Sequence, residues 1–429
     1  MPASAVILGL GTFGGGLGAA RHLVRQGHDV LITDLRSEED LAKPLAELRP
    51  ELDAGSITLR LGEHNVSDVT TCELLVVNPA IKKPWEDRFV RAAHAAGVRT
   101  TTEIALALDA LPESCTRVGV TGSAGKSTTA AMIHVGLIAA GRTAHLGGNI
   151  GGSLLDRMAD ITRDEAVVVE LSSAQLWWLD QPGAFETDRW FDAAVVTNLT
   201  ENHLDWHGNL DHYARSKHVL TKRLDHNAWA VLGEGVSDFP THAKRAGPAP
   251  DDAFPKLAVP AAHNRINASL ALAACEAVCA DTERAAHGIA HFPGLPHRLQ
   301  FIREHKGVRY INDSKSTTPD ATRLAVAAFD AAHVHLIVGG SDKGADLSPI
   351  AELGTSVRSL LCIGATGNTV AAIAGVEPMR TLEHAVAAAN ASAEPGDTVL
   401  LSPGCASFDQ FASFEDRGNR FAELVHSLQ

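Results

Sequence analysis

The sequence predicts an α/β protein of three domains, each built on a mostly parallel sheet. Apolar, strand-like runs alternate with alanine-rich helical stretches along most of the 429 residues, and this alternation is typical of parallel βα units. The runs are apolar throughout, as expected of strands that helices cover on both faces. A prior of roughly 100–200 residues per domain favours three domains for a chain of this length.

Each predicted strand is a short apolar run that ends in turn-forming or polar residues. The predicted strands are residues 5–11, 29–34, 72–79, 116–123, 166–173, 192–200, 227–233, 334–340, 359–365 and 397–404. Helices are predicted between them, for example at 14–27 and 269–280. Turn-rich segments around Pro112 and Pro293–Pro296 make plausible linkers. The predicted domains are therefore residues 1–113, 114–296 and 297–429.

Composition excludes several classes of protein. With 37 Lys and Arg against 51 Asp and Glu, the formal charge is −14, whereas nucleic-acid surfaces are basic. No apolar run approaches the roughly 18 residues of a membrane helix, and we expect no signal peptide because a charged leader is absent. Six Cys without a CxxC pair fit a reducing cytosol. We therefore expect a cytoplasmic enzyme with small-molecule partners, and a monomer because nothing resembles a coiled coil.

The first strand is followed by a glycine-rich turn and a helix. The turn contains Gly9, Gly11 and Gly14, and the second strand ends at Asp34. This is the spacing of a dinucleotide-binding fingerprint, in which backbone N–H groups approach a pyrophosphate at a helix N-terminus. A carboxylate at position 34 is placed to accept hydrogen bonds from a ribose or a base. Taken alone, the motif favours NAD, and a merely structural turn is the alternative.

A phosphate-binding loop opens the second domain. A strand leads into Gly122, Ser123, Ala124, Gly125, Lys126, Ser127 and Thr128, and a helix follows. In such loops the backbone N–H groups hold phosphates, the lysine reaches the β- and γ-phosphates, and a hydroxyl group of Ser127 or Thr128 can bind Mg²⁺. Val120 stands where the strict pattern has a glycine, so Gly122 is expected to supply the turn.

Acidic and amide side chains follow the neighbouring strands. Glu170 ends one predicted strand, and Glu201, His203 and Asp205 follow the next. An acidic strand end beside a phosphate loop is the expected place for Mg²⁺, which takes oxygen ligands. Spacing alone leaves His203 between a ligand and an ordinary hydrogen-bonding residue. Composition gives no reason to single out Lys217, and Asn264 and Asn267 are either helix caps or base-reading amides.

The third domain carries lysines and hydroxyl groups after several strands. Because carboxyl ends of parallel strands meet at one sheet edge, these residues predict a second anion-binding rim: Arg298, Asp313, Lys315, Thr317, Thr318, Lys343, Ser407 and Phe414. Taken singly, each of them is an ordinary loop residue.

Together these segments resemble the Mur ligases, ATP-dependent amide-forming enzymes of peptidoglycan precursor synthesis. The resemblance runs nearly end to end and is strongest for the glutamate-adding member. It rests on GLGTFG, TGSAGKSTT, GGNIGG, ELSSAQL, NLTENHLDWHG, HNRINA, LPHRLQ, INDSKSTTPDAT, GGSDKGADLS and LSPGCASFDQFASFEDRGNRF. It implies a Rossmann-like N-terminal domain that binds UDP rather than NAD, a central P-loop ATPase-like domain and a C-terminal Rossmann-like α/β domain that binds glutamate.

The resemblance also implies a role for each matching residue. Lys126, His203 and Lys217 would be catalytic, and ATP would contact the loop 122–128 with Asn264, Asn267, Arg298 and Asp313. The two Mg²⁺ ions that the resemblance implies would be held by Ser127, Glu170, His203 and a carbamylated Lys217. The UDP substrate would contact Gly11, Thr12, Phe13, Asp34, Arg36, Asn149, Ser172 and Gln175. The glutamate pocket would comprise Lys315, Thr317, Lys343, Ser407 and Phe414.

The activity implied is the ATP-dependent addition of D-glutamate to UDP-N-acetylmuramoyl-L-alanine through an acyl phosphate. Alternatives are the same ligation with L-glutamate, a folylpolyglutamate-synthase-like ligase, an NAD-dependent oxidoreductase and a non-catalytic nucleotide-binding scaffold. Two departures stand out. The Thr-Asn pair usual in the phosphate loop is Ser123-Ala124, so one side-chain amide is absent, and Asn202 replaces the residue before His203 that is often acidic.

Overall fold

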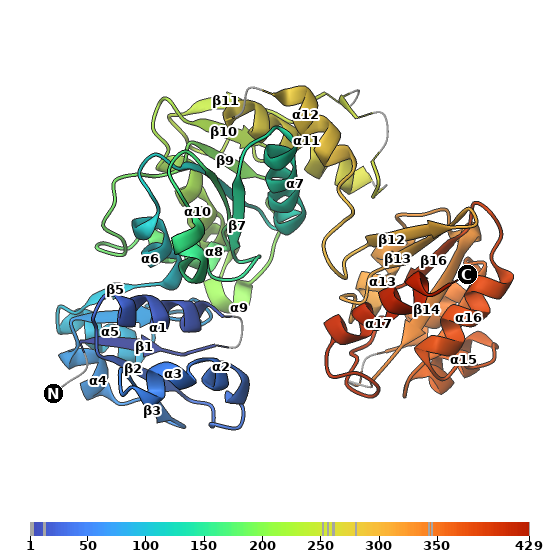
Figure 1. Cartoon of the computed structure of the whole chain (residues 1–429), viewed down its shortest axis with the longest axis horizontal. Helices are drawn as coiled ribbons and strands as arrows, with labels where there is room; N and C mark the ends of the chain where they lie inside the picture. The colour runs from blue at the N-terminus through green and yellow to red at the C-terminus, as the bar shows by residue number, and fades with distance from the viewer. Residues whose placement is uncertain are drawn as a thin grey trace. The chain divides into compact units, whose positions relative to one another are not determined.

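A computed structural model describes residues 4–11, 14–250, 253–254, 257–259, 262–278, 281–341, 344 and 346–428. It contains three α/β sheets with mostly parallel strands, which confirms the predicted fold class (Figure 1). The predicted strands and helices all appear. The N-terminal Thr12 and Phe13, and Lys343 of the predicted glutamate pocket, lie outside the described residues.

The first sheet has the strand order β3-β2-β1-β4-β5, and all its strands are parallel. Its central strands are buried because helices cover both faces. The strands are β1 (Ala5–Leu8), β2 (Val30–Asp34), β3 (Ile57–Leu61), β4 (Leu74–Val77) and β5 (Arg99–Thr101). The helices are α1 (Gly15–Arg25), α2 (Ala42–Glu47), α3 (Arg49–Asp53), α4 (Val66–Thr71), α5 (Arg88–Ala95) and α6 (Glu103–Ala110).

The second sheet has the order β11-β10-β9-β6-β8-β7 and is also parallel. Its strands are β6 (Thr116–Thr121), β7 (Ala144–Gly148), β8 (Ala166–Glu170), β9 (Ala193–Val196), β10 (Trp229–Leu232) and β11 (Lys244–Ala246). The helical segments are α7 (Lys126–Ala139), the 3-10 helix η1 (Leu154–Asp160), α8 (Ser173–Leu179), α9 (Leu204–His207), α10 (Leu210–Lys222), α11 (Ala262–Val278) and α12 (Thr282–Ala290).

The third sheet has the order β12-β13-β16-β14-β15, in which only the β12–β13 pair is antiparallel among the described strands. Its strands are β12 (Gln300–His305), β13 (Val308–Asn312), β14 (Val334–Gly339), β15 (Ser359–Ile363) and β16 (Thr398–Leu401). The helical segments are α13 (Pro319–Val326), η3 (Ala331–His333), α14 (Ser348–Glu352), η4 (Leu353–Thr355), α15 (Gly367–Ala374), α16 (Leu382–Ser392) and α17 (Phe414–His426).

The chain divides into two compact units. One comprises Met1–Ala253 and Ile266–Ile289, and the other comprises Phe254–Arg265 and Ala290–Gln429. The first two sheets share one apolar core, which contains Ile7 of β1 together with Val167 and Val169 of β8. None of the described helices is long and apolar enough to cross a bilayer. The domain boundaries at 113 and 296 stay predictions.

Candidate active site

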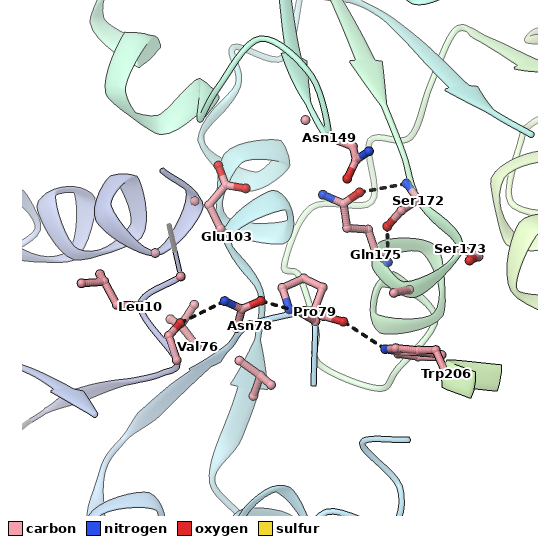
Figure 2. Close-up of a pocket in the computed structure, with 18 of the residues that line it drawn as sticks. Leu10, Val76, Asn78, Pro79, Glu103, Asn149, Ser172, Ser173, Gln175 and Trp206 are labelled. Atoms are coloured by element: carbon pink, nitrogen blue, oxygen red, sulfur yellow. Dashed lines mark hydrogen bonds between the residues drawn. The ribbon is translucent and has the colours of Figure 1, made fainter. Parts of the chain in front are cut away.

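A cavity of about 670 Å³ lies between the first and second sheets, within the first unit. Its lining comes from segments that follow β1, β4, β7 and β8, together with α9 and the start of α6. The carboxyl ends of strands from both sheets therefore open on one space, which is where open α/β sheets bind ligands. Figure 2 shows Asn149, Ser172 and Gln175 on one side of this space and Asn78 and Pro79 on another.

The glycine turn after β1 forms one wall. Gly11 lines the cavity, and the Leu10 N–H donates to Asp34 Oδ2 over 2.9 Å. Arg36 binds the same carboxylate, with Nη2 2.8 Å from Oδ2 and Nε 3.1 Å from Oδ1. Burial opposes ionisation, but the hydrogen bonds from Arg36 hold the pKa of Asp34 below its ordinary value. In this structure the Asp34 carboxylate therefore fixes both the glycine turn, through Leu10, and the side chain of Arg36.

The opposite wall contains three predicted substrate residues. Ser172 and Gln175 form a capping box at the start of α8, in which Ser172 N–H donates to Gln175 Oε1 over 2.8 Å and Gln175 N–H to Ser172 Oγ over 3.2 Å. Asn149 Nδ2 donates to Glu170 Oε1 over 3.2 Å. All three residues line the cavity, so the structure gathers them with Gly11 at one site.

The phosphate loop connects β6 to α7, and neighbouring residues pack closely against its glycines. Gly122 has φ 145°, and a Cβ there would lie 1.9 Å from Thr197 Oγ1. Gly125 has φ 79°, and a Cβ there would lie 2.4 Å from Asn267 Oδ1. These positions require glycine. Lys126 begins α7, and its Nζ donates to the Ser123 carbonyl over 3.0 Å.

Two residues that the sequence analysis missed support this loop. Asn198 Oδ1 accepts from the Ala124 N–H over 2.9 Å, and Thr197 Oγ1 donates to the Ala124 carbonyl over 2.6 Å. Ser123 Oγ contacts Tyr213 Oη at 2.9 Å. The signal was present, because Thr197 and Asn198 directly follow the strand that ends at Val196. The side-chain amide of Asn198, which follows β9, thus fixes the phosphate loop at Ala124, a position where the loop itself has no side-chain amide.

A buried lysine and a buried glutamate lie behind the loop. Lys217 is 1% exposed, and its Nζ donates to the Gly122 carbonyl over 2.6 Å. Burial and, next, the positive charge of Lys126 place the pKa of Lys217 well below its ordinary value. Glu170 is 1% exposed, and its Oε2 has no hydrogen-bond partner among the described residues. A buried carboxylate oxygen without a partner fits a cation-binding role.

His203 caps α9 with a positive φ of 51° and lines the cavity with an exposed side chain. Partial burial and the nearby Lys126 and Lys217 lower the pKa of its imidazole. A neutral imidazole is the form that binds a metal. In the described part of the chain, no three His, Cys, Asp or Glu side chains gather as a metal cage. A site of few protein ligands plus substrate phosphates is typical of Mg²⁺.

The predicted adenine residues lie on α11. Asn267 is 5% exposed, and its Oδ1 accepts from Thr129 Oγ1 over 3.3 Å. Within the first unit it therefore packs against the phosphate loop. Asn264 is equally buried, and its Nδ2 lies 3.5 Å from the Val259 carbonyl.

The third sheet forms a separate rim in the second unit. Asp313 follows β13, and its carboxylate accepts from Leu299 N–H (3.1 Å), Ser316 Oγ (2.5 Å) and Ser402 Oγ (2.7 Å). Burial raises the pKa of Asp313 to about 6. These bonds pin the loop that carries the exposed Arg298. Around the rim, the exposed Lys315 lies with its Nζ 5.8 Å from the Phe414 ring, Ser407 is 2% exposed and Thr317 is half-buried.

Arg417 organises this rim and was not predicted. It is 1% exposed, and its guanidinium donates to Ser314 Oγ (2.9 Å), to the Ser314 carbonyl (2.9 Å) and to the Cys405 and Ala406 carbonyls (3.1 and 3.2 Å). One buried cation therefore joins the loops after β13 and β16. Arg417 lies in the charged run Glu415, Asp416 and Arg417, and sequence alone cannot tell a buried arginine in such a run from a solvated one.

Comparisons with known proteins agree along the chain. Residues 3–102 match the Mur ligase MurD-like N-terminal domain, residues 120–248 the Mur ligase middle domain and residues 297–405 the Mur ligase glutamate ligase domain. A relative from Geobacter metallireducens is 34% identical, covering 98% of this chain and 97% of its own. One from Anaeromyxobacter dehalogenans is 35% identical, covering 96% and 95%. Both carry the name UDP-N-acetylmuramoylalanine–D-glutamate ligase.

A solved structure supports the fold. The UDP-N-acetylmuramate–alanine ligase from Thermotoga maritima superposes with a TM-score of 0.56 at 18% identity, covering 99% of each chain. The fold and the site define a ligase class with a phosphate loop in the middle domain, and this chain belongs to the Mur ligase family. Its N-terminal glycine turn lies in a MurD-like domain, so the NAD interpretation, which the family resemblance had already displaced, is not supported.

Proposed function

We propose that this chain is an ATP-dependent amide ligase that joins D-glutamate to UDP-N-acetylmuramoyl-L-alanine in peptidoglycan precursor synthesis. The observation that carries the proposal is the arrangement of the first unit: the cavity that begins at the glycine turn of β1 is also lined by His203, and Asn149 on its wall binds Glu170. The two curated relatives described above carry the name of this reaction over nearly the whole chain.

In the first half-reaction, the alanyl carboxylate of the substrate attacks the γ-phosphate of ATP and gives an acyl phosphate and ADP. The N–H groups at the start of α7 hold the phosphates, and Lys126 offsets their charge. Glu170, His203 and the Ser127 hydroxyl group are the residues that would hold Mg²⁺, which supplies charge neutralisation when bound. Asn149, Ser172 and Gln175 orient the muramoyl part.

In the second half-reaction, the amine of glutamate attacks the acyl carbonyl and phosphate leaves. Lys315, Thr317, Lys343, Ser407 and Phe414 are proposed to bind glutamate, and a lysine holds its carboxylate by a charge-assisted hydrogen bond. The ATP roles of Asn264, Asn267, Arg298 and Asp313, and the uridine contacts of Thr12, Phe13, Asp34 and Arg36, belong to the same proposal. So do a monomeric state and a cytoplasmic location.

We further propose that Lys217 is carbamylated. A carbamate forms when a neutral amine adds to CO₂ and releases a proton, and burial favours the neutral amine of Lys217 by lowering its pKa. The product would carry an acidic group behind the phosphate loop, where its oxygens can support a second Mg²⁺.

The test is phosphate release from ATP by the full chain with Mg²⁺ and UDP-N-acetylmuramoyl-L-alanine, with D- and L-glutamate added separately. Release that needs the UDP substrate and D-glutamate supports the proposal. Release with L-glutamate alone, or with a folate in place of the UDP substrate, would replace it by the corresponding alternative, and no release would leave a nucleotide-binding scaffold.

The matched variant is Lys126→Ala, which removes the phosphate contact of the loop. We expect turnover to fall below detection, whereas calorimetry still finds the UDP substrate bound. Ligation retained by this variant would contradict the assignment of the phosphate loop.

A further inference from the structure

Glu103 lies in the substrate cavity with no role in the chemistry described so far. It is the first residue of α6 and, of the described residues that line the cavity, the only acidic one. Figure 2 shows it at the edge of the cavity, between Leu10 and Asn149. The other polar residues of this lining carry amides, hydroxyl groups and imidazoles.

The two oxygens of its carboxyl group have different surroundings. Oε1 accepts a hydrogen bond from Ser153 Oγ. Ser153 Oγ also accepts from the Leu155 N–H over 3.2 Å, so Ser153 occupies Oε1 and is itself fixed by a second hydrogen bond. Oε2 hydrogen-bonds to no described residue. A proton on Oε2 therefore has no acceptor among the described residues and is available to a ligand in the cavity.

Oε2 lies at the start of α1. It is 3.8 Å from the position that a Cβ of Gly15 would occupy, and Gly15 is the first residue of that helix. The glycine pattern predicts a diphosphate at this turn, because helix N-termini bind phosphate through unpaired N–H groups, and under the proposed function that diphosphate belongs to the UDP substrate. A carboxylate at the same place would compete for those groups and repel the ligand.

We propose that Glu103 is a binding residue for the diphosphate of the UDP substrate, with Oε2–H donating to a phosphate oxygen at the start of α1. The proposal rests on the proposed function for the identity of the ligand. It makes Glu103 a determinant of binding rather than a catalytic residue, since the reacting carboxylate and ATP lie with the phosphate loop.

The charges and the burial around Glu103 favour the neutral form of its carboxyl group. Burial raises the pKa of Glu103 to about 7, the Ser153 hydrogen bond opposes the rise, and the negative charge of Asp156 adds to it. Asp156 is on η1, which packs on α6, and it faces Arg21 of α1 at 3.8 Å. Arg25 of α1 donates to the Leu155 carbonyl over 2.9 Å. Burial lowers the pKa of His207 to about 3, so this imidazole is neutral at pH 7, and burial also lowers the pKa of His203, which favours its neutral form.

The expected consequence is binding that weakens as pH rises. Below pH 7 Glu103 is protonated and donates, and above pH 7 it is an anion beside a dianionic diphosphate. Calorimetry of the full chain with UDP-N-acetylmuramoyl-L-alanine, and separately with UDP, is run from about pH 6 to about pH 8.5 without ATP or glutamate. For the wild type we expect affinity to fall about 10-fold across this range.

Two substitutions separate the roles of charge and hydrogen bond. Glu103→Gln keeps a donor without a charge, so its affinity should stay within about 3-fold of the wild-type value at pH 6 and not change with pH. Glu103→Ala loses the donor and should bind about 10-fold more weakly at pH 6, again without pH dependence. Glu113→Gln, an exposed acid beyond the end of the same helix, should follow the wild type.

Identical pH profiles for the wild type and Glu103→Gln would overturn the proposal, as would binding by Glu103→Ala at pH 6 as tight as that of the wild type. Should Glu103→Gln fail to fold, Ser153→Ala takes its place: it removes the hydrogen bond that lowers the pKa of Glu103, so the fall in affinity should move to higher pH, and an unmoved profile would contradict the proposal. A wild type that binds UDP with this profile but not the muramoyl substrate would leave Glu103 in place and refute the proposed function. Binding of neither ligand would refute both.

Discussion

At the scale of single residues, the chemistry of the side chains beside the phosphate loop depends on how deeply they are buried, which the sequence does not show. The pattern of glycines predicted the loop, because phosphate binding requires those residues at that spacing. Lys217 and Glu170 are each 1% exposed, which residue type alone does not reveal. Strand patterning placed Glu170 at the end of a buried strand, whereas Lys217 followed from family resemblance alone.

The carbamylation proposal for Lys217 makes a prediction at this scale. Lys217→Ala should lower turnover by on the order of 10–100-fold, as loss of a group supporting a metal does, and added formate or acetate should restore part of the activity by replacing the carbamate. Phosphate release measures both effects. Lys222→Ala, an exposed lysine on the same helix, is the control and should neither lose activity nor respond to the acids.

At the scale of elements, the central strands were mostly predictable and several edge strands were not. Central strands such as β8 are apolar and fully buried, so sequence pattern identified them. The edge strands β3, β11 and β12 carry exposed or half-buried polar residues, and no apolar run marks them. The antiparallel β12–β13 pair was missed for the same reason, although β13 itself was expected before Asp313.

The amino ends of β14, β15 and β16 meet at Asp397, which is 1% exposed. It accepts from the Glu394 N–H over 2.9 Å and contacts His333 and His335, with Arg358 Nε at 3.7 Å. Burial opposes these contacts, but together they lower the pKa of Asp397 to about 2. Because its pKa is lower in the folded state, Asp397 stabilises the fold at pH values above its unfolded-state pKa, near 4. This stabilisation is lost as the pH falls towards 2.

Asp397→Asn should therefore lower the free energy of unfolding at pH 7 by about 2 kcal/mol. The difference from the wild type should shrink as pH falls below about 4. Urea unfolding of the full chain at several pH values measures it. Glu394→Gln, which removes an exposed ion pair with Arg358, should cost under about 1 kcal/mol. A pH-independent loss in Asp397→Asn would show that packing, not charge, is responsible.

At the scale of the whole molecule, a tryptophan-rich joint connects the first two sheets within the first unit. Trp85, between β4 and α5, has its ring centroid 5.4 Å from those of Trp177 on α8 and Trp206 on α9. Trp206 Nε1 donates to the Pro79 carbonyl over 3.1 Å, and Lys82 pairs with Asp205 at 2.7 Å. Pro79 and Trp206 also line the cavity, so the joint sets the width of the site.

Trp206→Ala should destabilise the first unit by about 3 kcal/mol, as removal of a buried tryptophan does. It should also raise KM for the UDP substrate about 10-fold, because misplaced walls cost binding and orientation, while KM for ATP changes little. Trp206→Phe keeps an aromatic ring, although a smaller one, and loses one hydrogen bond, so a smaller loss of about 1 kcal/mol is expected. Steady-state kinetics with each substrate varied, together with thermal melting, distinguish the two. A lower maximal rate with both KM values unchanged would point to general unfolding, and equal rises in both KM values would contradict an effect confined to the cavity.

The division of the chain into two units also has a consequence for synthesis. Phe254–Arg265 belong to the second unit, and Ile266–Ile289 return to the first. Val259 contributes to the apolar core beneath the third sheet, and Arg309 Nη2 donates to the Ala258 carbonyl over 3.0 Å. As the ribosome releases the chain, the first unit must wait for residue 289 while a segment of the second is already exposed. Folding during translation therefore cannot proceed strictly one unit at a time, and a gene fragment that starts at residue 297 would encode a second unit without part of its interior.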